Sequence, residues 1–475
     1  MAGFEDYETY DGLGLAELVR AKEVAPTDLL EAAIARVERH NPALNAVVHE
    51  MYDAARRAIA DGLPEGPFTG VPFLLKDLGA LYSGTPTTNG SRLFAVYVAD
   101  HDTTLTERVR AAGLVIMGKT NTPEMGVSAA CEPVLHGATR NPWNPERSPG
   151  GSSGGAAAAV AARLVPMAHG SDGGGSIRIP AANCGLFGLK PTRARNPAGP
   201  DVGEGWSGLS TAHAVTRSVR DSAALLDATS GPAPGDPYWA PPPARPFLDE
   251  VGADPGRLHI AFTTTAPNGV PVHPECVKAA VEAARLCAGL GHGVTEAAPE
   301  LDMELAIRTM RTIWAANLWA AVETRYQALG READGDGLET ITWLLAQEGR
   351  TQCAADYARA LPVIHGIGRG FARFFEDYDL LLTPTLAQPP WPLGTIDMMG
   401  RDLEAYFDTL YAHMPFTAQF NASGQPAVSV PLHWTGDGLP VGVQFVARFG
   451  DEATLLRLSA QLEAARPWAD RRPPL

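Results

Sequence analysis

The feature that most constrains this chain is a pair of glycine-rich segments, 148–155 and 172–178, each of which carries a serine. Glycine loses more backbone entropy on folding than any other residue, so such dense clusters are retained where backbone N–H groups must approach another group closely. Ser152 and Ser176 lie inside these clusters, and the alanine-rich run 156–162 between them predicts a helix. Both serines are therefore candidates for covalent catalysis beside a backbone oxyanion hole.

The composition excludes several classes of protein. The chain has 475 residues, of which 45% are hydrophobic and 19% are charged, as is usual for a globular enzyme with a large core. A net charge of −16 argues against a nucleic-acid partner, because phosphate contacts require a basic face. No apolar run reaches the roughly 18 residues that a membrane span needs. The acidic segment 1–10 lacks the features of a signal peptide, so we expect a cytoplasmic protein.

Cysteine usage indicates neither a disulfide framework nor a zinc site. The five cysteines are odd in number, scattered and free of any C-x-x-C spacing. We expect reduced thiols, no metal and no cofactor. The cysteines are Cys131, Cys184, Cys276, Cys287 and Cys353.

Apolar runs alternate with helical patterns along the chain, which predicts an α/β fold. Strands are expected over 71–75, 114–117 and 165–168, a hairpin over 427–432 and 441–446, and mostly helix over 303–375. The segment 230–256 is rich in proline and glycine and predicts a long surface connection. Because strands of similar composition lie on both sides of it, we predict a single domain over 1–475.

Ser176 is the better candidate for a nucleophile. Gly173, Gly174 and Gly175 precede it, so up to four successive N–H groups can surround one oxygen atom. Each preorganised donor of this kind contributes roughly 10²–10³ in rate. The structural alternative is a tight glycine turn with an idle serine.

The segment 150–154 also matches the G-x-S-x-G elbow of α/β-hydrolases, with Ser152 as nucleophile. This short pattern is weak in a chain with 49 glycines, and the polar, proline-rich segment 140–149 before it does not predict the strand that an elbow follows. A triad also needs a histidine, and a structural role is the simpler interpretation of each one considered. These are His213, His292, His365, His413 and His433.

A lysine is the alternative base. Lys76 follows the apolar run 71–75 and is expected at the end of a buried strand. Its pKa would have to fall from about 10.4 to roughly 7–8, which burial and hydrogen bonds from serine hydroxyls can supply. Lys119 and Lys190 also follow apolar residues and remain alternatives.

Taken together, these motifs resemble the amidase signature family, whose members are serine hydrolases with a Ser–cis-Ser–Lys triad. The resemblance extends over about residues 10–470. It implies an α/β fold with a large mixed β-sheet core covered by helices on both sides. The signature core is expected over about 66–220 and a variable helical substrate-pocket region over about 290–375. The matching segments are 70–77, 118–121, 149–155, 172–180, 185–192, 380–385 and 421–426.

The resemblance assigns a role to each member of the triad. It implies that Lys76 is the base and Ser176 the nucleophile. Ser152 would be held in a cis peptide and relay the proton between them. Three further residues are implied to orient the triad: Ser153, Asp172 and Arg178.

The oxyanion hole would be formed by four backbone N–H groups. The resemblance places these on Gly173, Gly174, Gly175 and Ser176. Many members carry isoleucine at the position of Gly173, and the glycine keeps the backbone donor. We therefore expect a more flexible loop here than in those members.

The activity implied is hydrolysis of C–N bonds in small, largely apolar amides. Segments 120–126 and 137–144 resemble members that hydrolyse aryl acylamides, 6-aminohexanoate cyclic dimers and related oligoamides, or carbamates and urethanes, with esterase side activity expected. One alternative is the glutaminase subunit of a tRNA-dependent amidotransferase, although its usual Asp-Glu-Phe-Ala-Met-Gly motif is missing. A catalytically silent binding protein is another, and the intact triad argues against it.

The substrate pocket is expected between segments 126–131, 196–209 and the helices over 303–375. A small-molecule amide or carbamate is the expected binding partner, and the protein is expected to be a monomer or homodimer. The candidate pocket residues are Gly126, Val127, Ala129, Cys131, Trp206 and Leu209.

Overall fold

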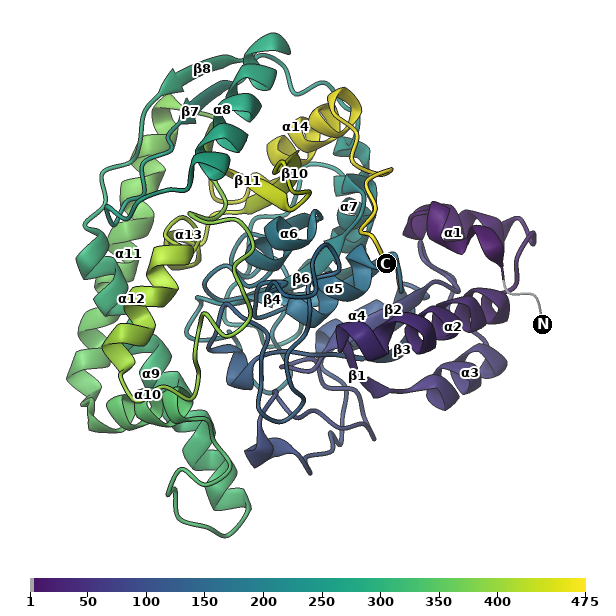
Figure 1. Ribbon diagram of the computed structural model, residues 1–475, viewed down its shortest axis with the longest axis horizontal. Coiled ribbons are helices and arrows are strands. Elements are labelled where there is room, and N and C mark those ends of the chain that lie inside the picture. Colours follow the sequence, from purple (N-terminus) through teal and green to yellow (C-terminus); the bar gives the residue numbers. More distant parts are fainter. Residues whose placement is uncertain (1–3) are drawn as a thin grey trace.

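A computed structural model describes residues 4–475, and these form an eleven-stranded sheet (Figure 1). Residues 1–3, part of the acidic N-terminal segment considered above, lie outside the described residues. In spatial order the strands are β1 (Val47–Glu50), β3 (Val115–Thr120), β2 (Pro72–Lys76), β4 (Met167–Asp172), β6 (Thr211–Thr216), β5 (Phe187–Lys190), β10 (Ala427–Trp434), β11 (Pro440–Ala447), β9 (Leu380–Pro384), β7 (His259–Phe262) and β8 (Gly293–Glu296).

The sheet is mixed, as the resemblance implied. Strand β2 runs parallel to both β3 and β4, and β7 runs parallel to β8 and β9. The strands from β4 through β6, β5, β10 and β11 to β9 are antiparallel neighbours. Strand β4 extends to Asp172, beyond the predicted end at Ala168, because it pairs with β6 along its whole length.

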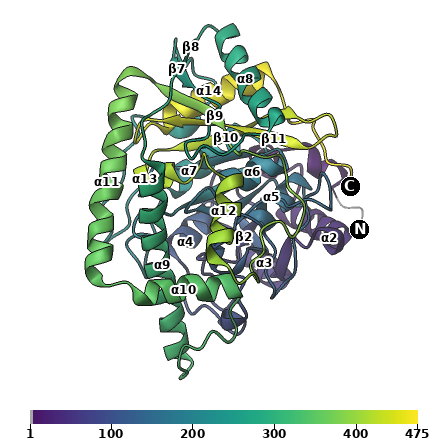
Figure 2. The ribbon, with the colours of Figure 1, turned by 60° about the vertical axis from the view of Figure 1, so that its left-hand side comes forward.

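Helices cover both faces of the sheet (Figures 1 and 2). Alternation along β11 shows this directly: Val443 and Phe445 pack with helices α8 and α14, whereas Val446 packs with the cluster formed by α9–α13. The helices are α1 (Gly12–Arg20), α2 (Pro26–Leu44), α3 (Tyr52–Asp61), α4 (Thr104–Ala111), α5 (Gly154–Ala161), α6 (Arg178–Cys184), α7 (Val219–Thr229), α8 (Pro274–Gly289), α9 (Met303–Ala328), α10 (Thr340–Thr351), α11 (Ala354–Asp377), α12 (Leu403–His413), α13 (Gln419–Ser423) and α14 (Glu452–Ala465).

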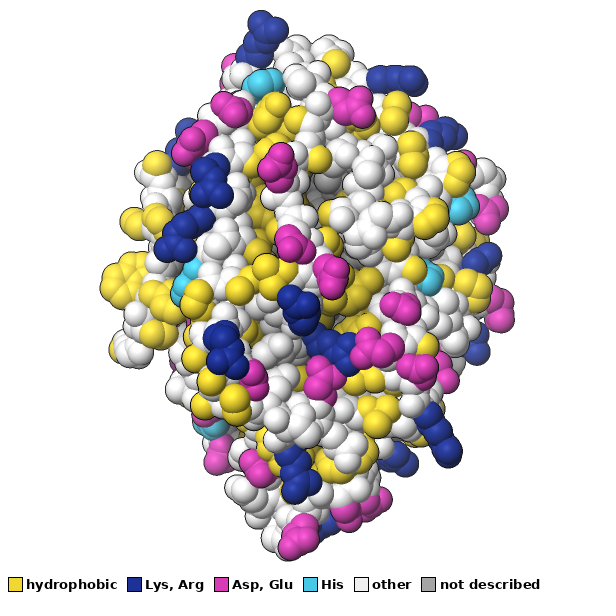
Figure 3. All heavy atoms as spheres, turned by 90° about the vertical axis from the view of Figure 1, so that its left-hand side faces the viewer, with side chains coloured by type: hydrophobic (Ala, Val, Ile, Leu, Met, Phe, Trp, Pro, Cys, Tyr) yellow, Lys and Arg dark blue, Asp and Glu magenta, His cyan; other side chains and the backbone are white. Residues whose placement is uncertain are grey.

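The surface connection 230–256 lies between α7 and β7 and contains one short 3₁₀ helix, Phe247–Glu250, whose Phe247 is buried. Among the described residues, no helix is both long and apolar enough to cross a membrane. On the face viewed in Figure 3, the side of α9–α12, acidic and basic side chains are interspersed.

The second glycine-rich segment begins at the end of a central strand, β4, whereas the first follows a long irregular segment after β3. Parallel strands β2 and β4 are neighbours, so their carboxyl ends, at Lys76 and Asp172, meet at one edge of the sheet. Helix α5 begins at Gly154, within the first glycine-rich segment, and α6 begins at Arg178, the last residue of the second. The fold therefore brings Lys76 and both candidate serines to the same region.

Helix α5 is buried along its whole length and packs against neighbouring backbone at Gly155. A Cβ atom there would lie 2.6 Å from the carbonyl oxygen of Asn121 and 2.7 Å from that of Ala46. Helix propensity alone favours alanine by about 1 kcal/mol. Because backbone cannot move aside like a side chain, we predict that Gly155→Ala lowers the free energy of unfolding by about 1–3 kcal/mol in denaturant titrations.

The matched control is Gly366→Ala in α11, where the glycine is exposed and no atom lies within 4 Å of an added Cβ. This variant should be neutral or stabilised by up to about 1 kcal/mol. Equal effects of the two substitutions would contradict the packing argument.

Candidate active site

Lys76 lies at the end of β2 and is completely buried. Its Nζ atom is 2.6 Å from Ser152 Oγ and 3.0 Å from Ser171 Oγ, and it forms no ion pair within residues 4–475. Burial lowers the pKa of Lys76 to about 7, although Cys131 and Asp172 act in the opposite direction. A lysine in this environment is readily neutral and can accept a proton.

The first glycine-rich segment presents Ser152 to this lysine. The peptide bond between Gly151 and Ser152 is cis, as the resemblance implied, and Ser152 is buried. The next residue joins the two segments: Ser153 N–H donates to the carbonyl of Ser176 at 3.2 Å. Its hydroxyl also accepts from the N–H of Ser171 at 3.3 Å. These bonds fix the two segments relative to each other.

The second glycine-rich segment is organised by a buried ion pair. Both carboxylate oxygens of Asp172 accept from Arg178, at 2.8 and 3.0 Å, and neither side chain is exposed. Asp172 also accepts from the N–H groups of Gly175 (2.8 Å) and Ile177 (3.1 Å). Burial alone would raise the pKa of Asp172, but the neighbouring guanidinium of Arg178 holds it well below its usual value.

The oxyanion donors differ from the expectation at one position. The N–H of Gly175 donates to Asp172 and is not free. The N–H groups of Gly173, Gly174 and Ser176 have no partner among the described residues. These three N–H groups are therefore available to a substrate oxygen.

Residues from the C-terminal part of the chain support this loop, and sequence reasoning assigned them no role. Asn421 Nδ2 donates to a carboxylate oxygen of Asp172 at 2.9 Å. Gln444 Oε1 accepts from Arg178 at 2.8 Å, and the Thr417 hydroxyl donates to the carbonyl of Gly174 at 2.6 Å. Only Asn421 lies in one of the segments that match the family, 421–426. No sequence pattern indicated that Gln444 or Thr417 contacts this loop.

His169, another residue that sequence reasoning missed, lies in β4 beside Lys76. Its Nδ1 accepts the backbone N–H of Lys76 at 3.2 Å, so the neutral ring carries its proton on Nε2. Burial lowers the pKa of His169 to about 3. With its lone pair occupied, this histidine is poorly suited to act as a general base.

The alternative lysines have other partners. Lys119 Nζ donates to the carbonyl of Pro86 at 2.6 Å and to Thr87 Oγ1. Lys190 Nζ donates to the carbonyl of Pro191 at 2.9 Å. Unlike Lys76, neither lysine forms a hydrogen bond with Ser152 or Ser176 among the described residues.

Two cavities meet at Ser176. The first is mainly apolar, and the second contains more polar groups. Ser152 lines only the second cavity, and within residues 4–475 no hydrogen bond joins its hydroxyl to that of Ser176. The first cavity is lined by Gly126, Val127, Ser128, Ala129, Gly174, Ser176, Ile179, Trp206, Trp314, Leu318, Leu345, Phe407, Leu410 and Met414.

Four of the six predicted pocket residues line the first cavity, namely Gly126, Val127, Ala129 and Trp206. Cys131 and Leu209 line neither cavity, so their placement in the pocket was wrong. The Cys131 thiol lies 3.5 Å from Thr139 Oγ1 beneath the start of α5. Leu209 is buried in the hydrophobic core, where its apolar side chain is excluded from solvent.

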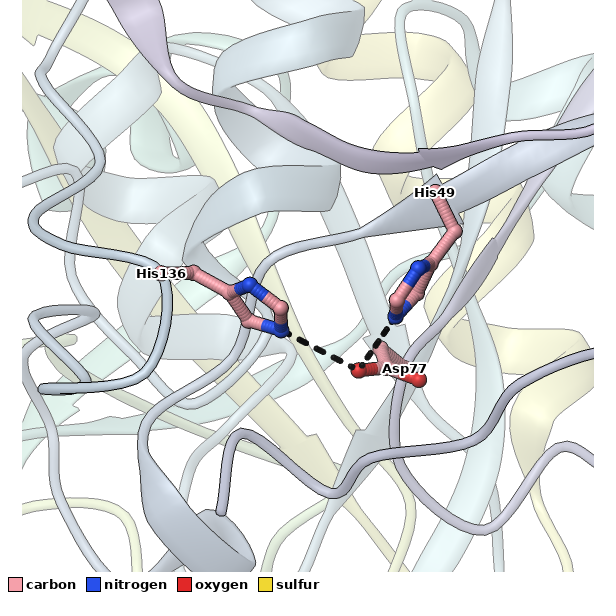
Figure 4. A group of neighbouring side chains, drawn as sticks. All are labelled: His49, Asp77 and His136. Atoms are coloured by element: carbon pink, nitrogen blue, oxygen red, sulfur yellow. Dashed lines mark ion pairs between the residues drawn. The ribbon is translucent and has the colours of Figure 1, made fainter. Parts of the chain in front are cut away.

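Three side chains of metal-ligating type converge beside Lys76, although their sequence spacing did not indicate a cluster (Figure 4). Asp77 Oδ2 lies 3.4 Å from His49 Nε2 and 3.8 Å from His136 Nε2. Asp77 also accepts from the N–H of Thr88 at 2.9 Å and from its hydroxyl. Burial acts to raise the pKa of Asp77, but the effect of these donors is larger than that of burial and lowers the pKa to about 2. The carboxylate is thus already surrounded by donors that tie three segments together.

Comparison with known proteins supports the family resemblance. The Amidase family profile matches residues 28–456. The 6-aminohexanoate-cyclic-dimer hydrolase of Paenarthrobacter ureafaciens is 43% identical over 477 aligned residues, covering 98% of this chain and 96% of the relative.

Solved structures agree with this assignment. A 6-aminohexanoate cyclic dimer hydrolase superimposes with a TM-score of 0.93 at 40% identity, covering 98% of this chain and 99% of the other. A bacterial aryl acylamidase of the amidase signature family has a TM-score of 0.87 at 28% identity, covering 97% of each chain. On the combined evidence of sequence, fold and site geometry, this chain belongs to the amidase signature family.

Proposed function

We propose that this protein is a serine amidohydrolase that cleaves neutral, largely apolar amides through an acyl-enzyme on Ser176. The observation that carries the proposal is the buried Lys76, whose amine lies 2.6 Å from Ser152 and has no counter-charge in an ion pair. The free N–H groups around Ser176 supply the second requirement, a site for the developing oxyanion.

In the acylation step, Ser176 Oγ attacks the substrate carbonyl and passes its proton to Ser152, while Ser152 passes its own proton to neutral Lys76. The carbonyl oxygen becomes negatively charged and accepts from the N–H groups of Gly173, Gly174 and Ser176. The two hydroxyls line one cavity, so rotation of the serine side chains in the bound complex can close the relay. Catalytic hydrogen bonds commonly tighten in this way on substrate binding.

The relay then runs in reverse. Lys76 returns the proton through Ser152 to the leaving nitrogen, the C–N bond breaks, and the amine departs. Water, deprotonated by the same relay, attacks the acyl-enzyme and releases the acid.

The cavities indicate the kind of substrate. No Asp, Glu, Lys or Arg side chain lines either cavity, and His169 in the second is held neutral. A charged substrate would lose its hydration without gaining an ion pair. Because relatives include hydrolases of 6-aminohexanoate cyclic dimers, we propose neutral oligoamides as the first substrate class, with aryl acylamides, carbamates, urethanes and esters as further ones.

We predict that a serine-directed fluorophosphonate labels Ser176, because of the two candidate serines it alone follows three glycines and lines both cavities. Peptide mass spectrometry of the labelled protein checks this, and Ser176→Ala should abolish the label while leaving the melting temperature close to that of the wild type. Label on Ser152 would favour a nucleophile elbow instead. A complete lack of label on the folded protein would favour a silent binding protein.

Lys76 must be neutral to act, and its pKa is lowered to about 7. Activity should therefore be low below pH 6, rise through a limb near pH 7 and level off above pH 8, where Lys76 is deprotonated. Lys76→Met keeps most of the length of the side chain and removes the base, so kcat should fall at least ~10²-fold without loss of thermal stability.

Full pH profiles of kcat for the wild type and this variant provide the measurement. His169→Asn is the comparison for a histidine-based mechanism. Retained activity in Lys76→Met together with an inactive but folded His169→Asn would show that the lysine mechanism is wrong.

Removing the relay should harm amides more than esters. An amine must be protonated as it leaves, whereas a phenolate leaves with little help. For Ser152→Ala we expect kcat/KM to fall roughly 10³-fold, or about 4 kcal/mol, for an anilide. For the matched phenyl ester, the factor by which kcat/KM falls should be at least ~10-fold smaller. Equal losses of kcat/KM for the two substrates would contradict the assignment of Ser152 to leaving-group protonation.

A further inference from the structure

The glycine at position 173 is closely covered by an indole ring. A Cβ atom added to Gly173 would lie 2.9 Å from Cε3 and 3.1 Å from Cζ3 of Trp206. At Gly174 the nearest atom is Cζ2 of Trp314, at 3.3 Å from an added Cβ. The volume of the missing side chain at position 173 is therefore filled from another segment.

The backbone around Trp206 is held in an unusual conformation. Trp206 and Ser207 have φ angles of +47° and +54°, in the left-handed region that bulky residues rarely occupy. Such conformations are energetically costly and persist only where the surroundings impose them. The Ser207 hydroxyl accepts from Asn317 Nδ2 of α9 at 3.0 Å and from the hydroxyl of Tyr357 of α11. Leu209 N–H closes the turn on the Trp206 carbonyl at 3.1 Å.

Trp206 stands where the two cavities meet. With Ser176 and Gly126, it is among the residues that line both. Ser152 lines only the second cavity, so the leaving nitrogen that it protonates belongs on that side and the acyl group in the apolar first cavity. The rings of Trp206 and Trp314 lie 6.1 Å apart and inclined at 57°, above the oxyanion glycines.

We propose that Trp206 is a specificity-determining residue that separates the acyl and amine sites, and that position 173 is glycine because the indole occupies that space. The inference rests on the proposed amidohydrolase function. Since the indole crowds the atoms next to the scissile carbonyl, the enzyme prefers acyl groups with an unbranched carbon at that point. Branching there places a methyl group against the Trp206 ring.

The test is a double-mutant cycle with two anilides, one with an unbranched hexanoyl group and one with a 2-methyl branch. Gly173→Ala should lower kcat/KM at least ~100-fold for both substrates, because the new methyl displaces the indole from the oxyanion loop. In the Gly173→Ala/Trp206→Ala double variant, kcat/KM should recover at least ~10-fold. Trp206→Ala alone should shift the ratio of kcat/KM at least ~10-fold toward the branched substrate, within the range of one methyl group in a pocket.

Two controls separate the ring from other effects. Trp206→Gly removes the same ring but relieves the left-handed strain, so it should give the same selectivity shift as Trp206→Ala. Trp319→Ala removes an indole from α9 outside both cavities and should leave the selectivity ratio unchanged.

An unchanged selectivity ratio in both Trp206 variants, or a double variant no better than Gly173→Ala alone, overturns the proposal. If Gly173→Ala does not fold, the ratios of the two Trp206 variants decide the question. Failure of the proposed function is distinguishable, because the wild type would then neither cleave the anilides nor label with fluorophosphonate at Ser176.

Discussion

The active-site architecture depends on the buried guanidinium of Arg178. All five of its N–H donors are used: they bind Asp172, Asn421, Gln444 and the carbonyl of Thr417. A fully buried charge is costly unless every polar atom is paired, and here the pairing is complete. The same side chain therefore shapes the catalytic loop and attaches it to the C-terminal elements α13 and β11.

This ion pair also affects Lys76, the proposed catalytic base. Asp172 acts on Lys76 to raise its pKa, and a free carboxylate would favour the charged amine. Because Asp172 is neutralised by Arg178, burial remains the larger influence on Lys76 and the amine is readily neutral. Separating the structural charges from the proton-transfer residues lets one compact site contain both.

The local parts of this site could be predicted from the sequence, and the long-range parts could not. Lys76 and the two serines each lie in a short pattern of apolar or glycine residues that reveals the local backbone. Thr417 and Gln444, in contrast, meet the loop across more than 240 positions of the chain, and nothing in their neighbouring residues indicates this. The errors at Cys131 and Leu209 have the same origin, because proximity in sequence to a pocket loop does not decide which face a side chain takes.

The three glycines before Ser176 are closely packed although they carry no side chains. Each glycine is covered from another segment: Gly173 by Trp206, Gly174 by Trp314 and Gly175, at φ +135°, by Thr417. Preorganised donors are effective because they need not reorient during the reaction, so this packing contributes to catalysis as well as stability. Helix α9 supplies both Trp314 and the Asn317 that anchors the Trp206 turn. Two residues that line the first cavity, Trp206 and Trp314, thus also cover the proposed oxyanion loop, and the proposed function therefore couples substrate selection to transition-state stabilisation.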